Sequence, residues 1–566
     1  MFAYRLRRKI PKSLLVTGVL ILSLVPSLGM NQLHVVEAAG SSQDSDFNGD
    51  GYADLAIGVP DENVGSTIDA GAVNVIYGNS SGLAYYSNQI WTQNSGGILD
   101  SSEANDHFGR SLAIGDFNKD GYDDLAVGVP DEDLVLPGPN VSGVLVNNTG
   151  AVNVIYGSSA GLSSAGNQLW NQGNTGIDTG GIANNNDDLF GRALTAGDFN
   201  KDGYEDLAIG IPSKDVKTVS SGAVEILYGS ASGLVATGGQ FWSQDGGIGD
   251  SPEFADFFGR ALAAGDFNKD GYADLAVGVP FEDINRTTTT GTVFNSNAGA
   301  VNVIYGSSSG LTGTDNQFWN QDSPGIADYT ENDDQFGYSL SAGDFNHDGY
   351  QDLAIGVPQE TIGTAATHAG AVNVIYGSAS KLTSSGNQFR SQNSAGIAGT
   401  SQSNDLFGLS VAAGDFNGDG YSDLAIGVPN ENVTGAVGAG AVNVIYGNTT
   451  GLESTGNQLW SQNSGSIDDA SEAGDNFGFV LVAGDFNKNG KDDLAIGVPL
   501  EDITSGNSNI SNAGAVNVIY GSSTRLTASG DQFWSQNSSN ILDSSESGDH
   551  MGSALAAGME SANQLT

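Results

Sequence analysis

Four short apolar segments recur in a fixed order along the chain, separated by segments rich in glycine, asparagine and serine. In the second copy they are FGRSLAIGDF (108–117), DLAVGVP (124–130), GAVNVIYG (150–157) and NQLWNQ (167–172). Each is rich in Val, Ile, Leu, Phe or Trp and is bounded by turn-forming residues, which is the pattern of β-strands joined by hairpins. The sequence therefore predicts a repeating unit of four antiparallel strands.

An aspartate-rich loop lies between the first and second predicted strand of each unit and marks the period. It reads GDFNKDGYDDLAVGVP in the second copy. Its first aspartate recurs every 68 to 82 residues, at Asp46, Asp116, Asp198, Asp266, Asp344, Asp415 and Asp485. A four-stranded unit repeated in this way predicts an all-β fold, a seven-bladed β-propeller over residues 44–560.

The two ends of the chain complement each other. The first copy starts directly at its loop and lacks the FGxSLAxG strand that opens every other copy, whereas HMGSALAAG (550–558) follows the seventh copy and stops before any loop. We expect this C-terminal strand to supply the fourth strand of the first blade and to close the ring, because an unclosed ring leaves open sheet edges. Residues 561–566 then form a short tail.

Residues 1–38 predict an export signal. A basic segment precedes the apolar run 13–29, and a small-residue pattern that resembles a cleavage site follows. A membrane anchor is the alternative, but Pro26 and Gly29 end the run before the roughly 20 residues that a span needs. We therefore expect a secreted or cell-surface protein with a short linker at 39–43 and no membrane span in the mature chain.

Charge and cysteine content narrow the possible partners. The formal net charge of −47 excludes nucleic acid and anionic membrane as partners, because both are polyanions, and it favours cations. The chain has no cysteine, so an exported protein of this sequence has no disulfide to stabilise it. Bound cations are the natural substitute.

The aspartate-rich loop has the spacing of a calcium site. In D-x-N-x-D-G-Y-x-D, side-chain oxygens stand at positions 1, 3, 5 and 9, a backbone carbonyl at position 7, and glycine at position 6 for the bend. Hard oxygens alternating along a tight turn are the ligands that Ca²⁺ prefers. A solvated Asp/Asn turn is the alternative, but it gives no reason for the oxygens to keep their register from copy to copy. No helix is predicted on either side, so the site is carried by a hairpin and is not an EF-hand.

The predicted calcium ligands, with the Tyr and Lys residues contributing a backbone carbonyl, are Asp46, Asn48, Asp50, Tyr52 and Asp54; Asp116, Asn118, Asp120, Tyr122 and Asp124; Asp198, Asn200, Asp202, Tyr204 and Asp206; Asp266, Asn268, Asp270, Tyr272 and Asp274; Asp344, Asn346, Asp348, Tyr350 and Asp352; Asp415, Asn417, Asp419, Tyr421 and Asp423; and Asp485, Asn487, Asn489, Lys491 and Asp493. The seventh set departs from the pattern. Asn489 replaces Asp at position 5 and Lys491 replaces Tyr at position 7, so this set loses a carboxylate and gains a cation. We expect up to seven calcium ions, with the seventh site weak or empty.

Other residues repeat with the blades. All six tryptophans stand in the fourth predicted strand, where a sugar-stacking role is possible but packing between blades explains their identical placement better. Acidic residues follow each G-V-P, at Glu62, Glu132, Glu282, Glu360, Glu431 and Glu501. Others precede each F-G or M-G, at Asp106, Asp188, Asp256, Asp334, Asp405, Asp475 and Asp549. Cation ligation is one interpretation of these acids, and acceptance of hydrogen bonds from loop N–H groups is the simpler one.

No catalytic residue is predicted. The chain has five histidines and no H-E-x-x-H motif. G-x-S-x-G occurs at 78–82, 157–161 and 306–310, but here it is the hairpin after GAVNVIYG rather than the strand-to-helix turn that a nucleophile needs.

The order F-G, calcium loop, G-V-P resembles the FG-GAP repeat of the integrin alpha-subunit N-terminal propeller, over nearly all of the chain after residue 44. The resemblance implies a seven-bladed propeller with calcium in the hairpin between the first two strands of a blade, and it implies adhesion or ligand binding. FG-GAP blades also accompany glycosylphosphatidylinositol phospholipase, whose catalytic part lies outside the blades. We therefore expect a non-catalytic, monomeric recognition module for a protein or glycan at the cell surface. A lectin-like propeller and a hydrolase of the phospholipase type are the alternatives.

Connectivity indicates a binding face. In up-and-down blades the calcium loops emerge on one face, whereas the connections between strands two and three emerge on the other. Those connections lengthen in the second blade (131–149) and the fourth blade (281–298). Since binding residues usually lie on loops held by a rigid scaffold, we expect recognition at these two segments.

Overall fold

The computed structural model describes residues 45–136, 144–177, 185–217, 219–245, 247–288, 291–506 and 508–558. These ranges contain strands, turns and bends, and no helix within them could cross a membrane. Backbone contacts divide the chain into two units, residues 1–34 and residues 35–566. The predicted export signal, linker and tail lie outside the described residues, all of which belong to the second unit.

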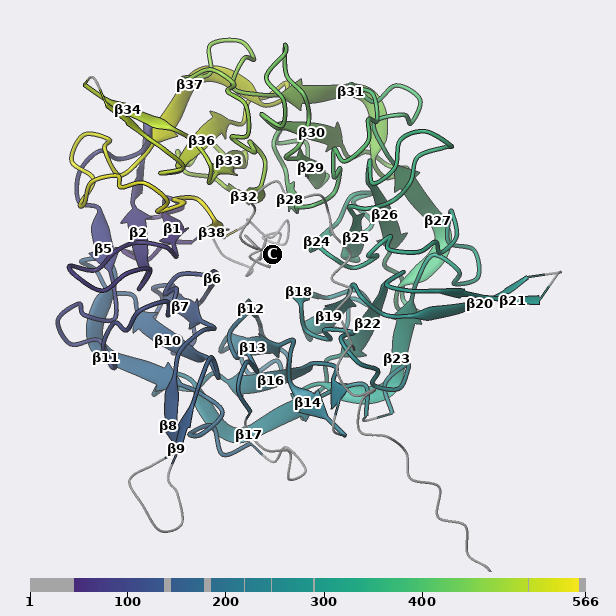
Figure 1. The fold of residues 1–566 in the computed structure, drawn as a ribbon. Helices are drawn as coiled ribbons and strands as arrows, with labels where there is room; N and C mark the ends of the chain where they lie inside the picture. Colours follow the sequence, from purple (N-terminus) through teal and green to yellow (C-terminus); the bar gives the residue numbers. More distant parts are fainter. Residues whose placement is uncertain are drawn as a thin grey trace, which may run out of the picture. The chain divides into compact units, whose positions relative to one another are not determined.

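Seven four-stranded antiparallel sheets follow one another around a ring (Figure 1). From the inner to the outer strand, the first three are β38 (Ala554–Ala556), β1 (Leu55–Val59), β2 (Ala72–Ile76) and β5 (Gln89–Trp91); β6 (Ser111–Gly115), β7 (Asp124–Val129), β10 (Ala151–Tyr156) and β11 (Ser163–Trp170); and β12 (Ala193–Gly197), β13 (Asp206–Ile211), β16 (Ala223–Tyr228) and β17 (Val235–Trp242). The other four are β18 (Ala261–Gly265), β19 (Asp274–Val279), β22 (Ala300–Tyr305) and β23 (Thr312–Trp319); β24 (Leu340–Gly343), β25 (Asp352–Val357), β26 (Ala371–Tyr376) and β27 (Thr383–Arg390); β28 (Val411–Gly414), β29 (Asp423–Val428), β30 (Ala441–Tyr446) and β31 (Glu453–Trp460); and β32 (Val480–Gly484), β33 (Asp493–Val498), β36 (Ala515–Tyr520) and β37 (Thr527–Trp534). The predicted seven-bladed all-β propeller is confirmed.

Short two-stranded ribbons add to the blades. They are β3 (Gly78–Asn79) with β4 (Gly82–Leu83), β8 (Leu134–Leu136) with β9 (Val144–Val146), β14 (Asp215–Val216) with β15 (Val219–Ser220), β20 (Ile284–Thr288) with β21 (Gly291–Asn295), and β34 (Ile503–Ser505) with β35 (Ser508–Ile510). Four of these five ribbons lie in connections between the second and third strands of a blade. The lengthened connections of the second and fourth blades therefore fold as hairpins of their own.

The two middle strands of each blade form the core. In the second blade, β7 and β10 pair from Leu125 with Ile155 to Val129 with Ala151, and every residue of both strands is buried. Neighbouring blades cover both of their faces, which is why these strands are apolar almost throughout and do not alternate. The outer strand β11 is half exposed and carries the polar residues.

The tryptophans pack between blades. Trp91 lies in a hydrophobic cluster with Leu125 and Val127 of the next blade, and Trp319 lies in one with Leu353 of the next blade. Trp534 is fully buried. This confirms the packing interpretation at these positions.

The glycines of F-G and G-V-P hold successive blades close together. Gly109 has a φ of +91°, and a Cβ there would lie 2.6 Å from the Ala72 carbonyl oxygen of the preceding blade. Gly58 faces it, since a Cβ at Gly58 would lie 2.1 Å from the Gly109 carbonyl oxygen. Both distances are far below van der Waals contact, so only glycine permits this approach of two backbones.

The C-terminal strand closes the ring. β38 pairs with β1 through Ala554 with Gly58 and Ala556 with Ala56. The predicted closure is confirmed. The strand brings the first blade to four strands and lies at the innermost position, because it carries the sequence that begins the other copies. The loops also meet across the seam, where Ala53 N donates to Asp485 O at 3.2 Å.

Truncation should test this closure. A chain that ends after Asp549 loses Met551 and Leu555, which are buried, and leaves β1 as an open edge. Loss of a buried leucine side chain alone costs about 2–5 kcal/mol, and an open edge promotes aggregation. We expect a lower melting temperature by calorimetry and oligomers by light scattering. A chain that ends after Gly558 is the control, and equal melting of the two monomeric proteins would contradict the closure.

Candidate metal centres and the opposite face

The aspartate-rich loops curl around their first carboxylate. In the second blade, Asp120 N and Gly121 N donate to the two oxygens of Asp116 at 3.1 and 2.9 Å. Tyr122 N donates to Asp120 Oδ1 at 3.1 Å. These bonds close a single turn between β6 and β7. Among the described residues, the three aspartates of such a loop do not form a group whose carboxylate oxygens all lie within 4.8 Å of one another. Glycine at position 6 is required there, since Gly121 has a φ of +87°.

The last aspartate of each loop is buried and begins the second strand. Asp124 is fully buried, and its oxygens accept bonds from Phe117 N at 3.1 Å and Gly157 N at 2.9 Å. Burial raises the pKa of Asp124 to about 9; the Gly157 N–H opposes this, and the charges of Asp116 and Asp120 add to it. The pKa is raised in the same way at Asp54, Asp206, Asp274, Asp352, Asp423 and Asp493.

The donor set of these loops fits a hard cation. Each predicted set lies in one turn, and every predicted side-chain ligand of the six full loops offers oxygen. The raised pKa of the last aspartate means that its surroundings do not by themselves stabilise a negative charge there. A divalent cation would neutralise that charge, with Asp116, Asn118, Asp120 and Asp124 as the side chains that would hold it in the second blade.

The seventh loop keeps the shape but not the charge. Asn489 N and Gly490 N donate to Asp485 at 3.0 and 2.7 Å, as in the other loops. Lys491 Nζ donates to the Asn489 carbonyl oxygen at 3.0 Å, which brings an ammonium group to the rim of the loop. The backbone therefore forms this turn even where a carboxylate is missing.

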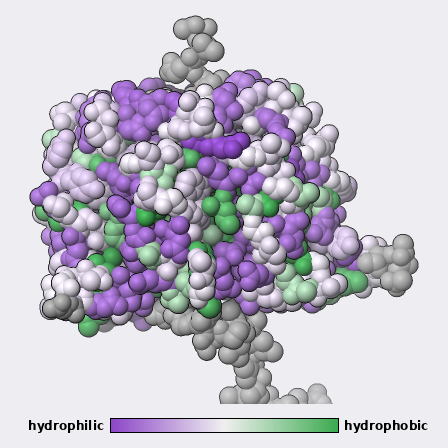
Figure 2. Space-filling model, turned by 90° about the horizontal axis from the view of Figure 1, so that it is seen from above, coloured by the Kyte–Doolittle hydropathy of each residue, from purple (hydrophilic) through white to green (hydrophobic). Residues whose placement is uncertain are grey.

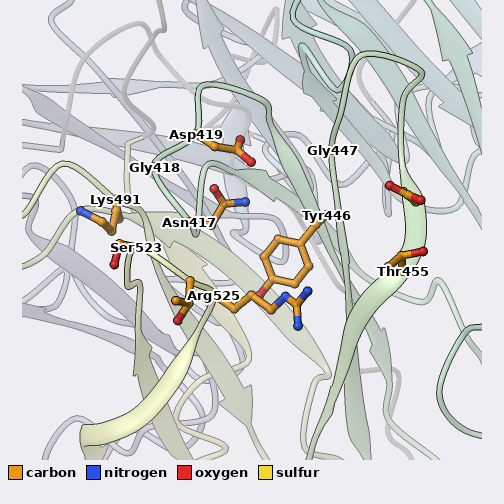
Figure 3. Close-up of a pocket in the computed structure, with 11 residues that line it drawn as sticks. Asn417, Gly418, Asp419, Tyr446, Gly447, Thr455, Lys491, Ser523 and Arg525 are labelled. Carbon is orange, nitrogen blue, oxygen red and sulfur yellow. The ribbon is translucent and has the colours of Figure 1, made fainter.

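A polar cleft of about 530 Å³ lies on the same face, between the sixth and seventh blades (Figure 3). Asn417 and Asp419 of the sixth loop line it together with Tyr446 and Arg525. The Arg525 guanidinium lies 5.4 Å from the centre of the Tyr446 ring. This cleft was not predicted from the sequence. Arg525 could have indicated it, because it stands where most copies of the hairpin have glycine.

The repeated acids lie on the opposite face. The expected bonds to loop N–H groups are present: Asp256 Oδ2 accepts from Glu253 N at 2.6 Å, and Asp188 Oδ2 accepts from Asn185 N at 2.9 Å. The hydrogen-bond partner of the glutamates that follow G-V-P was not predicted from the sequence. Gln244 Nε2, from the end of the preceding blade, donates to Glu282 Oε2 at 2.5 Å. A glutamine two residues after the Trp position in every blade was the signal for this contact.

The ribbon β20–β21 extends outward beyond its blade (Figure 1). Arg286 anchors it, with its guanidinium 4.0 Å from the centre of the Tyr329 ring and its Nε 3.3 Å from Asp322 Oδ1. On the same ribbon, Val293 and Phe294 are 45% and 57% exposed. The ribbon therefore exposes apolar side chains, whereas Arg286 itself contacts the blade.

Large apolar side chains are also exposed elsewhere on the described part of the chain, among them Ile68, Phe254 and Val437 at 62%, 74% and 69%. On the side seen in Figure 2, hydrophobic residues form small separate groups between polar ones.

Comparison with known proteins places the chain in a family. The FG-GAP repeat matches residues 44–76, 108–154, 190–227, 258–301, 336–375, 407–445 and 477–519. Bovine (Bos taurus) phosphatidylinositol-glycan-specific phospholipase D is 34% identical over 189 residues, which are 33% of this chain and 20% of that protein. Integrin alpha-5 of Xenopus laevis is 31% identical over 248 residues, which are 43% of this chain and 20% of that protein. The chain thus spans about a fifth of the length of these relatives.

Among solved structures, an exotype rhamnogalacturonan lyase, YesX, aligns over 81% of this chain and 70% of its own, with a TM-score of 0.33 and 9% identity. That score is too low to indicate a shared fold. Each of the seven matched segments lies in one blade and contains its aspartate-rich loop and its G-V-P or G-I-P, and all but the first begin at the Phe-Gly of the blade. The chain belongs to the FG-GAP repeat family.

Proposed function

We propose that this protein is an exported, calcium-stabilised propeller that acts as a non-catalytic adhesion or ligand-recognition module, secreted or held at the cell surface. The observation that carries the proposal is the pair of ribbons β8–β9 and β20–β21, which present apolar side chains from a rigid scaffold. Leu145 is 57% exposed, as is Phe294. Binding residues usually lie on loops held by a rigid scaffold, which is why these ribbons, rather than single exposed apolar side chains elsewhere, support the proposal.

Calcium supports the scaffold in this proposal. The six full loops each gather three aspartates and an asparagine, and the last aspartate of each has a raised pKa. Hydrogen bonds link the loops of adjacent blades, for instance Asp123 N to Asp46 O at 3.2 Å. An ion in one loop therefore stabilises the junction with the next blade as well as its own hairpin.

The partner in this proposal is a protein or glycan at the cell surface, bound by a monomeric propeller. Recognition is assigned to the ribbons because they differ from each other, whereas the loops are nearly uniform. The relatives named integrin alpha and phospholipase D support two classes of function. A hydrolase is therefore the second candidate, and turnover of a glycosylphosphatidylinositol substrate by the purified chain would favour it.

Chelation should destabilise the protein. At free calcium one hundred times a site's dissociation constant, linkage contributes about 2.7 kcal/mol per site. We expect EDTA to lower the melting temperature clearly, and Asp120→Asn to melt below the parent in calcium but equal to it in EDTA. The proposal fails if the protein contains no calcium on elemental analysis and melts identically with and without chelator.

The seventh loop should be repairable. Asn489→Asp with Lys491→Tyr restores the carboxylate and removes the ammonium group, and the backbone turn is already present. We expect calcium to bind this loop at least tenfold more tightly by isothermal titration. Asn489→Asp alone is the matched control, with a smaller gain because Lys491 remains. Unchanged calcium binding in the double variant would show that these positions are not ligands.

Exchange of the ribbons should test the recognition face. Replacing 131–149 or 281–298 with NENVTGAVGA (430–439), the equivalent short connection of the sixth blade, removes Leu145 or Phe294 and keeps the flanking strands in place. Binding is first located on glycan arrays and fixed-cell panels. We expect each exchange to weaken it at least tenfold without changing calcium content or melting. Retained binding in both, with loss in Arg525→Ala, would place recognition in the cleft on the calcium face.

A further inference from the structure

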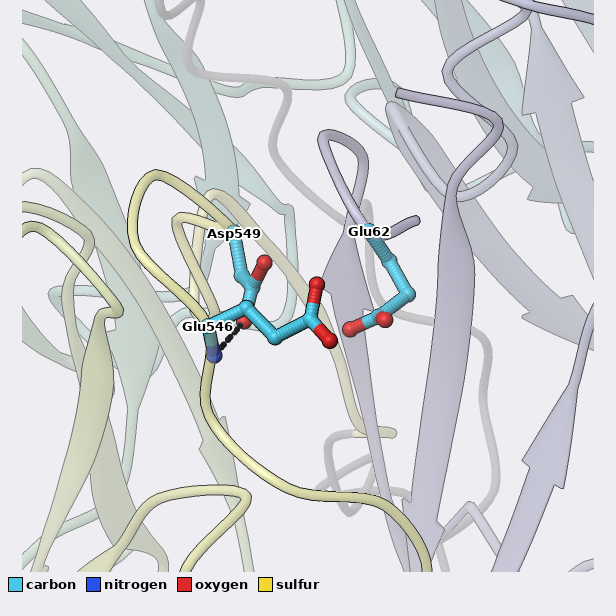
Figure 4. Close-up of side chains that lie close together, drawn as sticks. All are labelled: Glu62, Glu546 and Asp549. Carbon is cyan, nitrogen blue, oxygen red and sulfur yellow. Dashed lines mark hydrogen bonds between the residues drawn. The ribbon is translucent and has the colours of Figure 1, made fainter. Parts of the chain in front are cut away.

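Acidic clusters lie at four blade junctions, on the face opposite the calcium loops. In each, three carboxylates have oxygens within 4.8 Å of one another. We call these the junction clusters; they are Glu62, Glu546 and Asp549; Glu253, Asp256 and Glu282; Glu331, Asp334 and Glu360; and Glu472, Asp475 and Glu501. Figure 4 shows the three carboxylates of the first cluster directed toward one another. Three ionised carboxylates at this separation repel one another, so they need a positive charge nearby, supplied by protons or by a cation.

Buried oxygens without partners face these clusters. Gln244, 2% exposed, donates from Nε2 to Glu282 at 2.5 Å, so its carboxamide lies at the cluster, yet its Oε1 has no hydrogen-bond partner. Glu282 Oε1 is likewise buried without a partner. Oε1 is unpartnered in the equivalent glutamines Gln321, Gln462 and Gln536 as well, and also in Gln93 and Gln392 at junctions outside the clusters. Among the glutamates that follow G-V-P, the unpartnered oxygens are those of Glu282 and Glu501, which are therefore the feature specific to the clusters. Leaving such acceptors unsatisfied is costly, so a hydrogen-bond donor or a cation is expected beside them.

The third blade shows what fills this place. Its G-I-P is followed by Lys214 where the other blades have glutamate, and Lys214 is fully buried. Its Nζ lies 2.9 Å from Asp188 Oδ2 and 2.5 Å from Gln172 Oε1. Asp188 and Gln172 are the equivalents of Asp256 and Gln244. The glutamine here turns its carbonyl oxygen toward the cation.

The acids of the third blade change together with the lysine. Asn185 stands where the junction clusters have their second glutamate. Glu225 stands where the third strand of every other blade has asparagine. Burial raises the pKa of Glu225 to about 7, and the nearby Lys214 opposes this rise. The third blade thus replaces both glutamates of a cluster, one by Lys214 and one by Asn185, and adds the buried Glu225.

We propose that each of the four junction clusters binds a divalent cation, with Ca²⁺ as the expected ion, held by the three carboxylates and the amide oxygen of the adjoining glutamine. The ligands are all hard oxygens, which suit Ca²⁺ rather than a transition metal. Rotation of the glutamine amide turns its Oε1 to the ion, as Gln172 does toward Lys214. The ion would join the end of one blade to the start of the next.

The electrostatics of the clusters agree with this geometry. Burial, together with Asp256 and Asp250, raises the pKa of Glu282 to about 10, and burial raises that of Asp256 to about 7. Without a metal ion, the cluster would therefore hold protons at neutral pH. Protonation is the rival explanation, and it predicts no change in metal content when the cluster is altered.

Exchange of residues between blades tests the proposal by counting ions. Glu253→Asn with Glu282→Lys and Asn302→Glu gives the fourth blade the residues of the third, and we expect one calcium fewer per chain by equilibrium dialysis and elemental analysis. Asn185→Glu with Lys214→Glu and Glu225→Asn gives the third blade the acids of a cluster, and we expect one calcium more. Glu282→Gln, which keeps the shape of the side chain, provides the loss measurement if the lysine variant does not fold.

The sixth blade offers a matched control. Gln402 there takes the place of the cluster's second glutamate, so Glu431→Gln should leave the ion count unchanged. All counts are differences between folded variants, so they remain readable whether or not the loops on the other face bind calcium. Equal counts for the parent, Glu282→Gln and the third-blade variant would mean that the clusters hold protons, and would overturn the proposal.

Discussion

Compensation of buried negative charge is the constraint on which this propeller depends. Each inner hairpin begins its second strand with a buried aspartate such as Asp124, and most blades bury a glutamate just after the same strand, such as Glu132. Burial raises the pKa of both groups to about 9. The ring can close only if protons or cations neutralise these carboxylates, since blade packing excludes water from them.

The glycine motifs and the charge sites act on the same junctions. The close approach of Gly58 and Gly109 brings backbone of one blade against the next and leaves no room for side chains at the inner junction. The aspartate-rich loops lie at one end of this contact and the acidic connections at the other. Positive charge at either end would therefore stabilise association between blades, and in the third blade the side chain of Lys214 supplies it through an ion pair with Asp188.

The repeat allowed most of the fold to be predicted from sequence. Strand order, blade number and the closing role of 550–558 follow from the order of apolar segments and from the segment missing at the start. The innermost position of that strand was also encoded, because it carries the F-G type sequence of other first strands. The ribbon structure of 281–298 was not predictable, since its Thr-rich sequence lacks a clear strand pattern and is ordered by the contact of Arg286 with Tyr329.

Candidate sites could be predicted where their oxygen-bearing residues are close in sequence, and were missed where two blades contribute jointly. The loop of Asp116 to Asp124 is contiguous, so its spacing alone indicated a metal site, which stays a prediction. Gln244 and Glu282 are 38 residues apart and meet only across a blade junction. The most direct measurement is anomalous diffraction from crystals grown in calcium. The account predicts calcium peaks in the six full loops and between the carboxylates of the junction clusters; loops that contain only water beside their aspartates would contradict it.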